Sequence, residues 1–153
     1  MEKVLDKMRN LCSRREYCRS EIMKKALDAL DGDRSKAEHV VDVLTEEKYI
    51  DELRYASAFA RDKASLSGWG EVKIRYMLSS KRIPKDVIDM AVKEIDGAKA
   101  EARLLKLMES KFRTLKDDPQ CRIKMIRFGL GRGYGYEEVA DVLDSLMSNC
   151  KEK

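Results

Sequence analysis

Basic side chains gather in three segments of this chain. Binding of anionic groups is the chemistry that its residue types indicate most clearly. We call the following residues the basic strip: Arg14, Arg15, Arg19, Lys24, Lys25, Lys73, Arg75, Lys81, Arg82, Arg122, Lys124, Arg127 and Arg132. No aspartate or glutamate falls within residues 73–85 or 119–136. Clustered cations of this kind bind phosphates or acidic protein surfaces.

Aromatic residues lie beside the basic segments. They are Trp69, Tyr76, Tyr134 and Tyr136. Rings next to a positive strip can stack on exposed nucleic-acid bases. Aromatic residues at helical spacing also serve as packing residues. Both interpretations stay open, with Trp69, Tyr76 and Tyr134 as the stacking candidates.

Acidic side chains follow each basic segment. Acids outnumber bases in residues 38–52, 86–96 and 137–147. One explanation is mutual neutralisation through surface ion pairs of about 0–1 kcal/mol each. The other is that the basic segments form a shared positive strip for phosphates or an acidic partner, with the acidic segments turned elsewhere. The net charge of +4 is too small to decide between them.

The basic segments coincide with an internal repeat. CRSEIMKKALDAL from Cys18, GEVKIRYMLSSKR from Gly70 and CRIKMIRFGLGRG from Cys121 align without gaps. The fourth residue after each start is apolar, namely Ile22, Ile74 and Met125. Recurrence at a period near fifty residues is typical of repeated supersecondary units.

Each repeated segment is preceded and followed by a stretch with apolar residues three and four positions apart, which predicts amphipathic helices. The residues expected on the apolar face of the helix before the third segment are Ala102, Leu105, Met108 and Phe112. The fold class we predict is all-α, with three tandem three-helix repeats over residues 1–50, 51–97 and 98–150. Nine helices sharing one core is the alternative.

Residues that start and end helices support this division. Asp33 or Ser35 can cap the helix that holds Val40, and Asp51 stands in the same role for the next helix. Pro84 suits the first turn of the following helix, because its missing N–H has no intrahelical partner there. Gly133 suits the left-handed position that ends a helix.

Catalytic and cofactor motifs are missing from the sequence. It has no P-loop, and its Gly-x-Gly patterns follow no predicted strand. The single histidine, His39, has no nucleophile motif beside it. The cysteines form no CxxC pair, so we expect reduced thiols, no metal and no cofactor. With no signal peptide and no long apolar run, we expect a cytoplasmic protein that makes no membrane contact.

The sequence, with its three charged helical repeats, resembles the RecX family of recombination regulators. Three stretches carry the resemblance: Ile50–Ala56 (IDELRYA), Gly68–Arg75 (GWGEVKIR) and Lys124–Val139 (KMIRFGLGRGYGYEEV). Their order and spacing are specific, and the similarity runs over about residues 10–147. Three departures stand out. Arg82 stands where the family usually has Gly, and Cys18 stands where it often has Ser. Gly129 replaces an expected core Leu, and we expect this change to loosen the packing of the third repeat.

The resemblance implies an elongated, curved, non-enzymatic protein that docks into the groove of a RecA-type recombinase filament on single-stranded DNA. There it would block filament growth, ATP turnover or strand exchange, with the basic strip as the binding surface. We expect weaker binding to duplex DNA, and a monomer, because the chain has no long heptad pattern. The alternatives are a sequence-independent DNA-binding helical protein and a helical-repeat adaptor for another protein.

Overall fold

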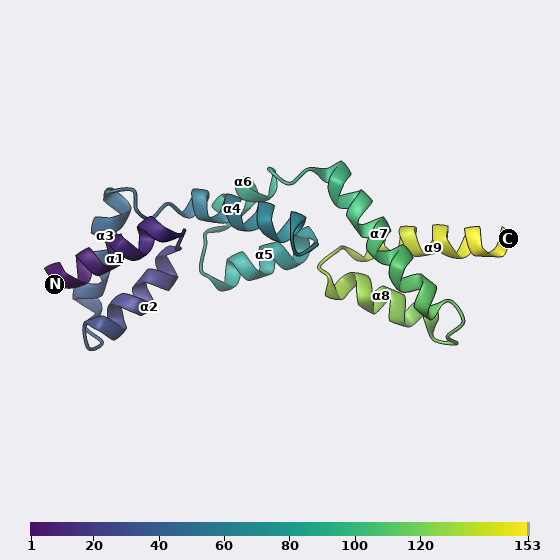
Figure 1. The fold of residues 1–153 in the computed structure, drawn as a ribbon, viewed down its shortest axis with the longest axis horizontal. Helices are drawn as coiled ribbons and strands as arrows, with labels where there is room; N and C mark the ends of the chain where they lie inside the picture. Colours follow the sequence, from purple (N-terminus) through teal and green to yellow (C-terminus); the bar gives the residue numbers. More distant parts are fainter. Residues whose placement is uncertain (153) are drawn as a thin grey trace. The chain divides into compact units, whose positions relative to one another are not determined.

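The computed structural model describes residues 1–152, and this part of the chain contains nine helices and no strand (Figure 1). The helices are α1 Glu2–Arg14, α2 Arg19–Ala29, α3 Arg34–Glu46, α4 Glu52–Ser65, α5 Glu71–Ser80, α6 Lys85–Val92, α7 Gly97–Leu115, α8 Cys121–Gly131 and α9 Tyr136–Glu152. The all-α prediction is confirmed. None of the described helices is long and apolar enough to cross a membrane.

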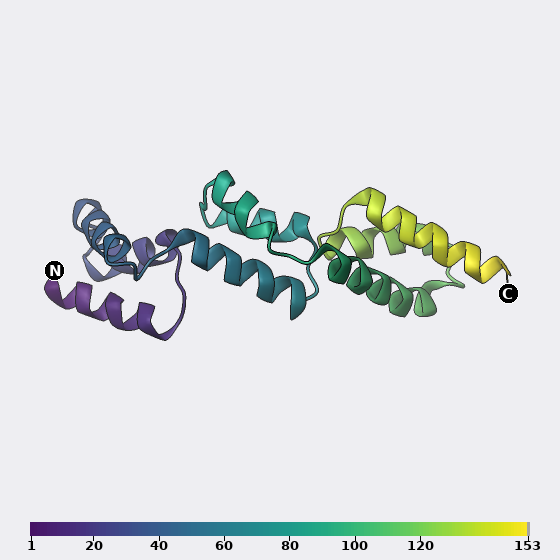
Figure 2. The ribbon, with the colours of Figure 1, turned by 90° about the horizontal axis from the view of Figure 1, so that it is seen from above.

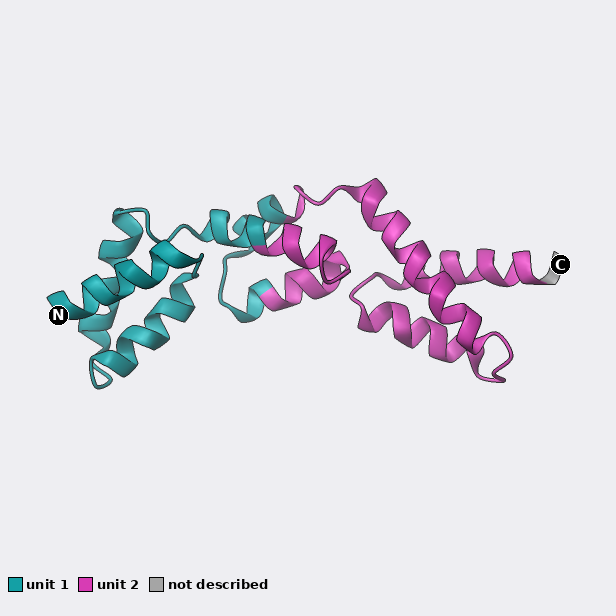
Figure 3. Ribbon diagram, viewed as in Figure 1, with its two compact units in different colours: residues 1–58, 78–91 teal, residues 59–77, 92–153 magenta. Residues whose placement is uncertain are grey.

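The chain divides into two compact units (Figure 3). Unit 1 contains residues 1–58 and 78–91, and unit 2 contains residues 59–77 and the chain from Val92 onward. Helices α4 and α5 each contribute residues to both units. The compact units therefore group the helices differently from the repeat boundaries that the sequence suggests.

The core of unit 1 lies among α1, α2 and α3. Its largest fully buried side chains are Met8, Ile22, Leu44 and Ile50. Val40 and Val41 are also fully buried, as the spacing of α3 predicts. Burying a branched aliphatic side chain contributes roughly 1.5–3 kcal/mol, so this cluster stabilises unit 1.

The core of unit 2 lies among α7, α8 and α9, which pack against one another in Figure 2. Met108, Met125, Val139 and Leu143 are fully buried there. The expected apolar face of α7 is partly wrong, because Leu105 is 41% exposed and Ala102 is exposed. Leu104 faces the core in their place, at 2% exposure.

Local signals account for the helix starts. The Asp33 carboxylate accepts the Lys36 amide at 3.1 Å, and the Asp51 carboxylate accepts the Arg54 amide at 2.9 Å. Both satisfy backbone donors that have no intrahelical partner. Pro84 stands one residue before α6, not in its first turn, and its carbonyl accepts the Ile88 amide at 3.0 Å.

The three middle helices end in the same backbone turn. The amide of Gly32 donates to the Leu27 carbonyl after α2, at 2.8 Å. After α5 and α8, the amides of Ile83 and Tyr134 donate to the carbonyls of Leu78 and Gly129, both at 3.3 Å. This six-to-one bond defines the Schellman motif, which needs a left-handed residue just before the donor. The left-handed residues are Asp31 at φ 55°, Arg82 at φ 62° and Gly133 at φ 95°.

Gly129 packs α8 closely against α9. It is buried, and a Cβ at this position would overlap both methyl groups of Val139. The expected loosening of this region is therefore wrong, because Val139 fills the space that a larger residue would take.

Candidate functional site

Arg19 belongs to the framework of unit 1. Its guanidinium donates to the Thr45 hydroxyl at 2.7 Å and to the Asp42 carboxylate at 3.0 Å, both on α3. Its amide donates to the Glu52 carboxylate at 2.8 Å. Burial raises the pKa of Glu52 despite this hydrogen bond. Arg19 therefore ties α2 to α3 and to the start of α4.

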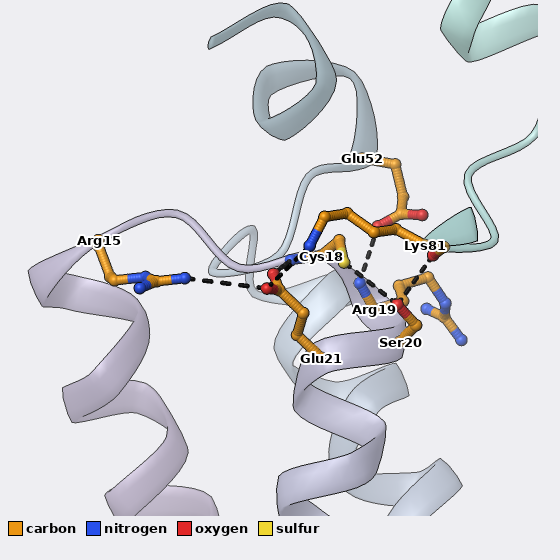
Figure 4. A network of polar contacts seen from close by, with 7 residues as sticks. All are labelled: Arg15, Cys18, Arg19, Ser20, Glu21, Glu52 and Lys81. Atoms are coloured by element: carbon orange, nitrogen blue, oxygen red, sulfur yellow. Dashed lines mark hydrogen bonds and ion pairs between the residues drawn. The ribbon is translucent and has the colours of Figure 1, made fainter. Parts of the chain in front are cut away.

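A second group of polar contacts connects the start of α2 to the turn after α5 (Figure 4). The Glu21 carboxylate accepts the Cys18 amide at 3.0 Å and lies 3.4 Å from the Lys81 ammonium. The Ser20 hydroxyl donates to the Lys81 carbonyl at 2.8 Å. Arg15 lies 3.8 Å from Glu21 at the edge of this group. Lys81 is therefore part of a structural network within unit 1.

Glu21 and Lys81 each stabilise the ionised form of the other. Burial alone would raise the pKa of Glu21, but hydrogen bonds from Cys18 and the Lys81 ammonium outweigh burial and lower it. Burial would likewise lower the pKa of Lys81, but Tyr55 and Glu21 raise it above its ordinary value. Both groups are therefore ionised at neutral pH, and they pair with each other inside unit 1.

Three cations of the basic strip in unit 1 are free to meet a partner. Arg14, Lys24 and Arg82 are exposed and make no ion pair with a described residue. Lys25 and Arg15 lie over the Tyr17 ring, at 5.7 and 4.3 Å from its centroid. Lys24 and Arg82 line an open groove of about 550 Å³ in unit 1.

This groove is lined by apolar residues and by mostly cationic polar residues. The apolar residues are Met23, Leu27, Val41 and Pro84. The other lining residues are Arg19, Ser20, Lys24, Arg34, Glu52 and Arg82. Its lining contains no aromatic ring on which a base could stack. A lining that combines apolar and basic side chains favours contact with an acidic protein surface over contact with nucleic acid.

Most basic-strip residues of unit 2 are also held in place. Arg122 pairs with Asp144 of α9 at 3.0 Å. Lys124 pairs with Asp118 at 2.6 Å, and Arg75 pairs with Glu71 at 3.4 Å. The Arg122 pair matches the Arg19–Asp42 pair of unit 1, since both arginines directly follow the cysteine that starts an aligned segment. Neutralisation by the acidic helices therefore accounts for these two arginines.

Arg127 is the exposed exception in unit 2. It lies on α8 and makes no ion pair with a described residue. Lys73 lies over the Trp69 ring, 4.4 Å from its centroid. Arg132 donates from Nη2 to the Ser67 carbonyl at 2.7 Å. Of this group, Arg127 alone presents an exposed cation without a partner in the described chain.

The aromatic candidates fall into three different environments. Tyr76 is 71% exposed and can offer its ring to a ligand. Trp69 is half-buried, with the ammonium groups of Lys63 and Lys73 within 4.8 Å of its ring centroid. Tyr134 is 4% exposed and donates its hydroxyl to the Gly68 carbonyl at 3.1 Å. Tyr134 is therefore a core residue and leaves no ring face for a base.

Sequence reasoning missed the cations of the helices that precede the repeated segments. Lys63 on α4 approaches Trp69, while Arg103 and Lys106 on α7 line a cavity together with Arg132. Arg103 and Lys106 are three residues apart without an acid between them, which was a usable signal. The described residues contain no cluster of His, Cys, Asp and Glu that could hold a metal ion.

Comparison with known proteins places these features in a family. Residues 51–92 match the family model described as the second three-helix domain of RecX, and residues 100–143 match the third. Regulatory protein RecX of Vibrio campbellii is 33% identical over 136 residues, which cover 87% of this chain and 84% of that protein. Its Clostridium botulinum (strain Alaska E43) counterpart is 35% identical over 112 residues, covering 71% of this chain and 52% of the relative. The chain spans about half the length of the clostridial relatives.

Solved structures share the fold. A crystal structure of regulatory protein RecX superposes with a TM-score of 0.83 at 23% identity, covering 94% of this chain and 71% of the other. The structure of RecX from Lactobacillus salivarius gives a TM-score of 0.78 at 20% identity, covering 95% and 98%. At these identities the likeness concerns the arrangement of helices.

Proposed function

The chain belongs to the RecX family, and from that premise we propose that it binds a RecA-type recombinase filament on single-stranded DNA and inhibits ATP turnover and strand exchange. It acts by binding and carries out no reaction of its own. The filament offers DNA phosphates and acidic protein faces, and both attract exposed cations. Binding to duplex DNA is weaker, and the active form is a monomer.

The observation that carries this proposal is the division of the basic strip into structural and exposed cations. Arg19, Lys81, Arg122 and Lys124 are engaged with acidic groups of the chain. Arg14, Lys24, Arg82 and Arg127 are exposed and make no ion pair with a described residue. The exposed set supplies the contacts to the filament, because a cation already neutralised gains little from a new partner.

The exposed cations divide between two partners. Those at the groove of unit 1 bind the recombinase, and the remaining ones bind DNA. Lys24 and Arg82 line the groove, whose apolar lining residues suit a protein side chain. Arg127 and Tyr76 lie outside it and are exposed on unit 2, where a phosphate and a base can reach them. We also propose that the repeats 1–50, 51–97 and 98–150 each supply a three-helix module, supported by the shared turn after α2, α5 and α8.

Co-sedimentation with a RecA filament assembled on single-stranded DNA tests the proposal. The variant Arg14→Glu/Lys24→Glu/Arg82→Glu is expected to bind at least ten-fold more weakly than the unchanged chain. Its matched control, Lys3→Glu/Lys93→Glu/Lys99→Glu, carries the same change of net charge on other exposed lysines and is expected to bind normally. Equal weakening by both triple variants would show that net charge alone governs binding. Full binding by the first would exclude its three residues from the interface.

A further inference from the structure

Unit 2 contains a small cationic cavity that the proposed filament contacts do not use. It is open to solvent and has a volume of about 330 Å³, near the lower end of the roughly 300–1,000 Å³ range of small-ligand sites. The end of α4 and its following loop form one wall, and one face of α7 forms another. The lining residues are Ser65, Leu66, Ser67, Gly68, Arg103, Lys106, Leu107, Ser110 and Arg132.

The charges of this cavity are all of one sign. Arg103, Lys106 and Arg132 line it, and no described lining residue is acidic. None of the three makes an ion pair with a described residue. Arg103 and Lys106 stand three positions apart on α7, where like charges repel and destabilise a helix by a few tenths of a kcal/mol. An anion in the cavity would remove that repulsion.

Two guanidinium nitrogens of the lining residues are buried without a hydrogen-bond partner. They are Nη1 of Arg103 and Nε of Arg132. Buried polar nitrogens are almost always paired, and an unpaired one signals a missing partner. Nη2 of the same Arg132 donates to the Ser67 carbonyl at 2.7 Å, which fixes this guanidinium at the cavity wall.

The backbone leaves room for this arrangement. Gly68 has φ 68°, and a Cβ there would lie 3.0 Å from Nη2 of Arg132. A side chain at position 68 would therefore press on the guanidinium. The hydroxyls of Ser67 and Ser110 add neutral donors around the three cations.

We propose that this cavity is a phosphate-binding site, with Arg103, Lys106 and Arg132 as its cations. A phosphate presents several acceptor oxygens to converging donors, and guanidinium groups bind it with charge-assisted, bidentate hydrogen bonds. Its source is either free phosphate or the phosphodiester of a nucleic acid. The proposal does not depend on recombinase binding, because anion binding needs no partner protein.

Phosphate titration of the full chain, followed by NMR of the arginine Nε–H signals, tests the site. At constant ionic strength, inorganic phosphate is expected to shift the signals of Arg103 and Arg132 saturably, and chloride is not. Lys106→Gln removes an exposed cation and is expected to weaken phosphate binding at least ten-fold. Arg113→Gln changes another exposed cation of α7 outside the cavity and is expected to leave binding unchanged.

Shifts that do not saturate, that chloride reproduces, or that Arg113→Gln weakens as much as Lys106→Gln would overturn the proposal. Arg103→Gln provides a second variant, with circular dichroism to confirm that it folds. A twelve-residue thymidine oligonucleotide then separates the two phosphate sources. Movement of the same two signals assigns the site to a nucleic-acid backbone, and phosphate binding without that movement assigns it to free phosphate.

Discussion

The amide of Gly70 donates to the carbonyl of Arg132 at 2.8 Å, joining the start of α5 to the turn after α8 within unit 2. Two residues on, the Val72 amide donates to the Gly133 carbonyl at 3.0 Å. A Cβ on Gly70 would overlap the Gly133 carbonyl, and one on Gly133 would overlap the Lys73 side chain. Glycine is therefore required at both positions for the two backbones to approach.

Replacing Gly70 by alanine should destabilise the protein by more than about 2 kcal/mol, because the backbones must separate and lose their hydrogen bonds. Urea unfolding followed by circular dichroism measures the change. Gly131→Ala is the matched control, since a Cβ there meets nothing within 4 Å. Its helical position favours alanine by roughly 0.5–1 kcal/mol, so the control should be as stable as the unchanged chain or more stable. A Gly70→Ala variant of normal stability would contradict the close approach.

The contact between Gly129 and Val139 gives a second prediction. Gly129→Ala should cost about 1–3 kcal/mol, because the new methyl group overpacks a filled core. Val139→Ala alone should also destabilise, since it leaves a cavity. The double variant should be more stable than the sum of the two losses predicts, because the new methyl group occupies the vacated space. Strict additivity in urea unfolding would refute this packing.

Arg82 is expected to carry conformational strain. A left-handed backbone costs a non-glycine residue roughly 1–2 kcal/mol, and Arg82 has φ 62°. Arg82→Gly should therefore raise stability by up to about 1 kcal/mol, after the greater flexibility of glycine in the unfolded chain is subtracted. Arg82→Ala removes the same charge but keeps the strain, so it should show no gain in thermal unfolding. Equal stability changes in the two variants would assign the effect to charge.

The stability of unit 1 should depend on pH through Glu21. Its folded pKa lies below the ordinary value of 4.5, so its contribution is present above that pH and is lost as pH falls through the folded pKa. Glu21→Gln should reduce stability at neutral pH and flatten the loss in acid. Urea midpoints measured from about pH 7 to pH 3 check this expectation. Glu38→Gln, at an exposed carboxylate, should retain the pH profile of the unchanged chain.

Features set by nearby residues were predictable from the sequence. Asp33 and Asp51 cap α3 and α4 because the carboxylate reaches an amide three residues on, a purely local relationship. The buried face of α7 was only partly predictable. Leu104 and Leu105 both stand three or four positions from Met108, and only packing against α8 and α9 selects Leu104. Periodicity alone cannot choose between adjacent residues at suitable spacing.

The sequence alone could not predict which residues of the basic strip are paired within the chain and which are exposed. Arg19 donates hydrogen bonds to Asp42 and Thr45, which lie more than twenty residues later in the sequence. Lys81 donates to Glu21, sixty residues earlier. The hydroxyl of the buried Tyr134 donates to the carbonyl of Gly68, sixty-six residues earlier. Composition indicates a surplus of cations, but only the fold shows which of them the chain neutralises itself.

ATP hydrolysis by a RecA filament on single-stranded DNA, measured while this protein is titrated in at moderate salt, tests the central claim most directly. The proposed function predicts suppression of hydrolysis at protein levels well below one per recombinase monomer. It also predicts that the Arg14→Glu/Lys24→Glu/Arg82→Glu variant suppresses poorly, while its lysine control acts normally. Undiminished hydrolysis by a filament shown to be assembled, at saturating levels of this protein, would contradict the claim.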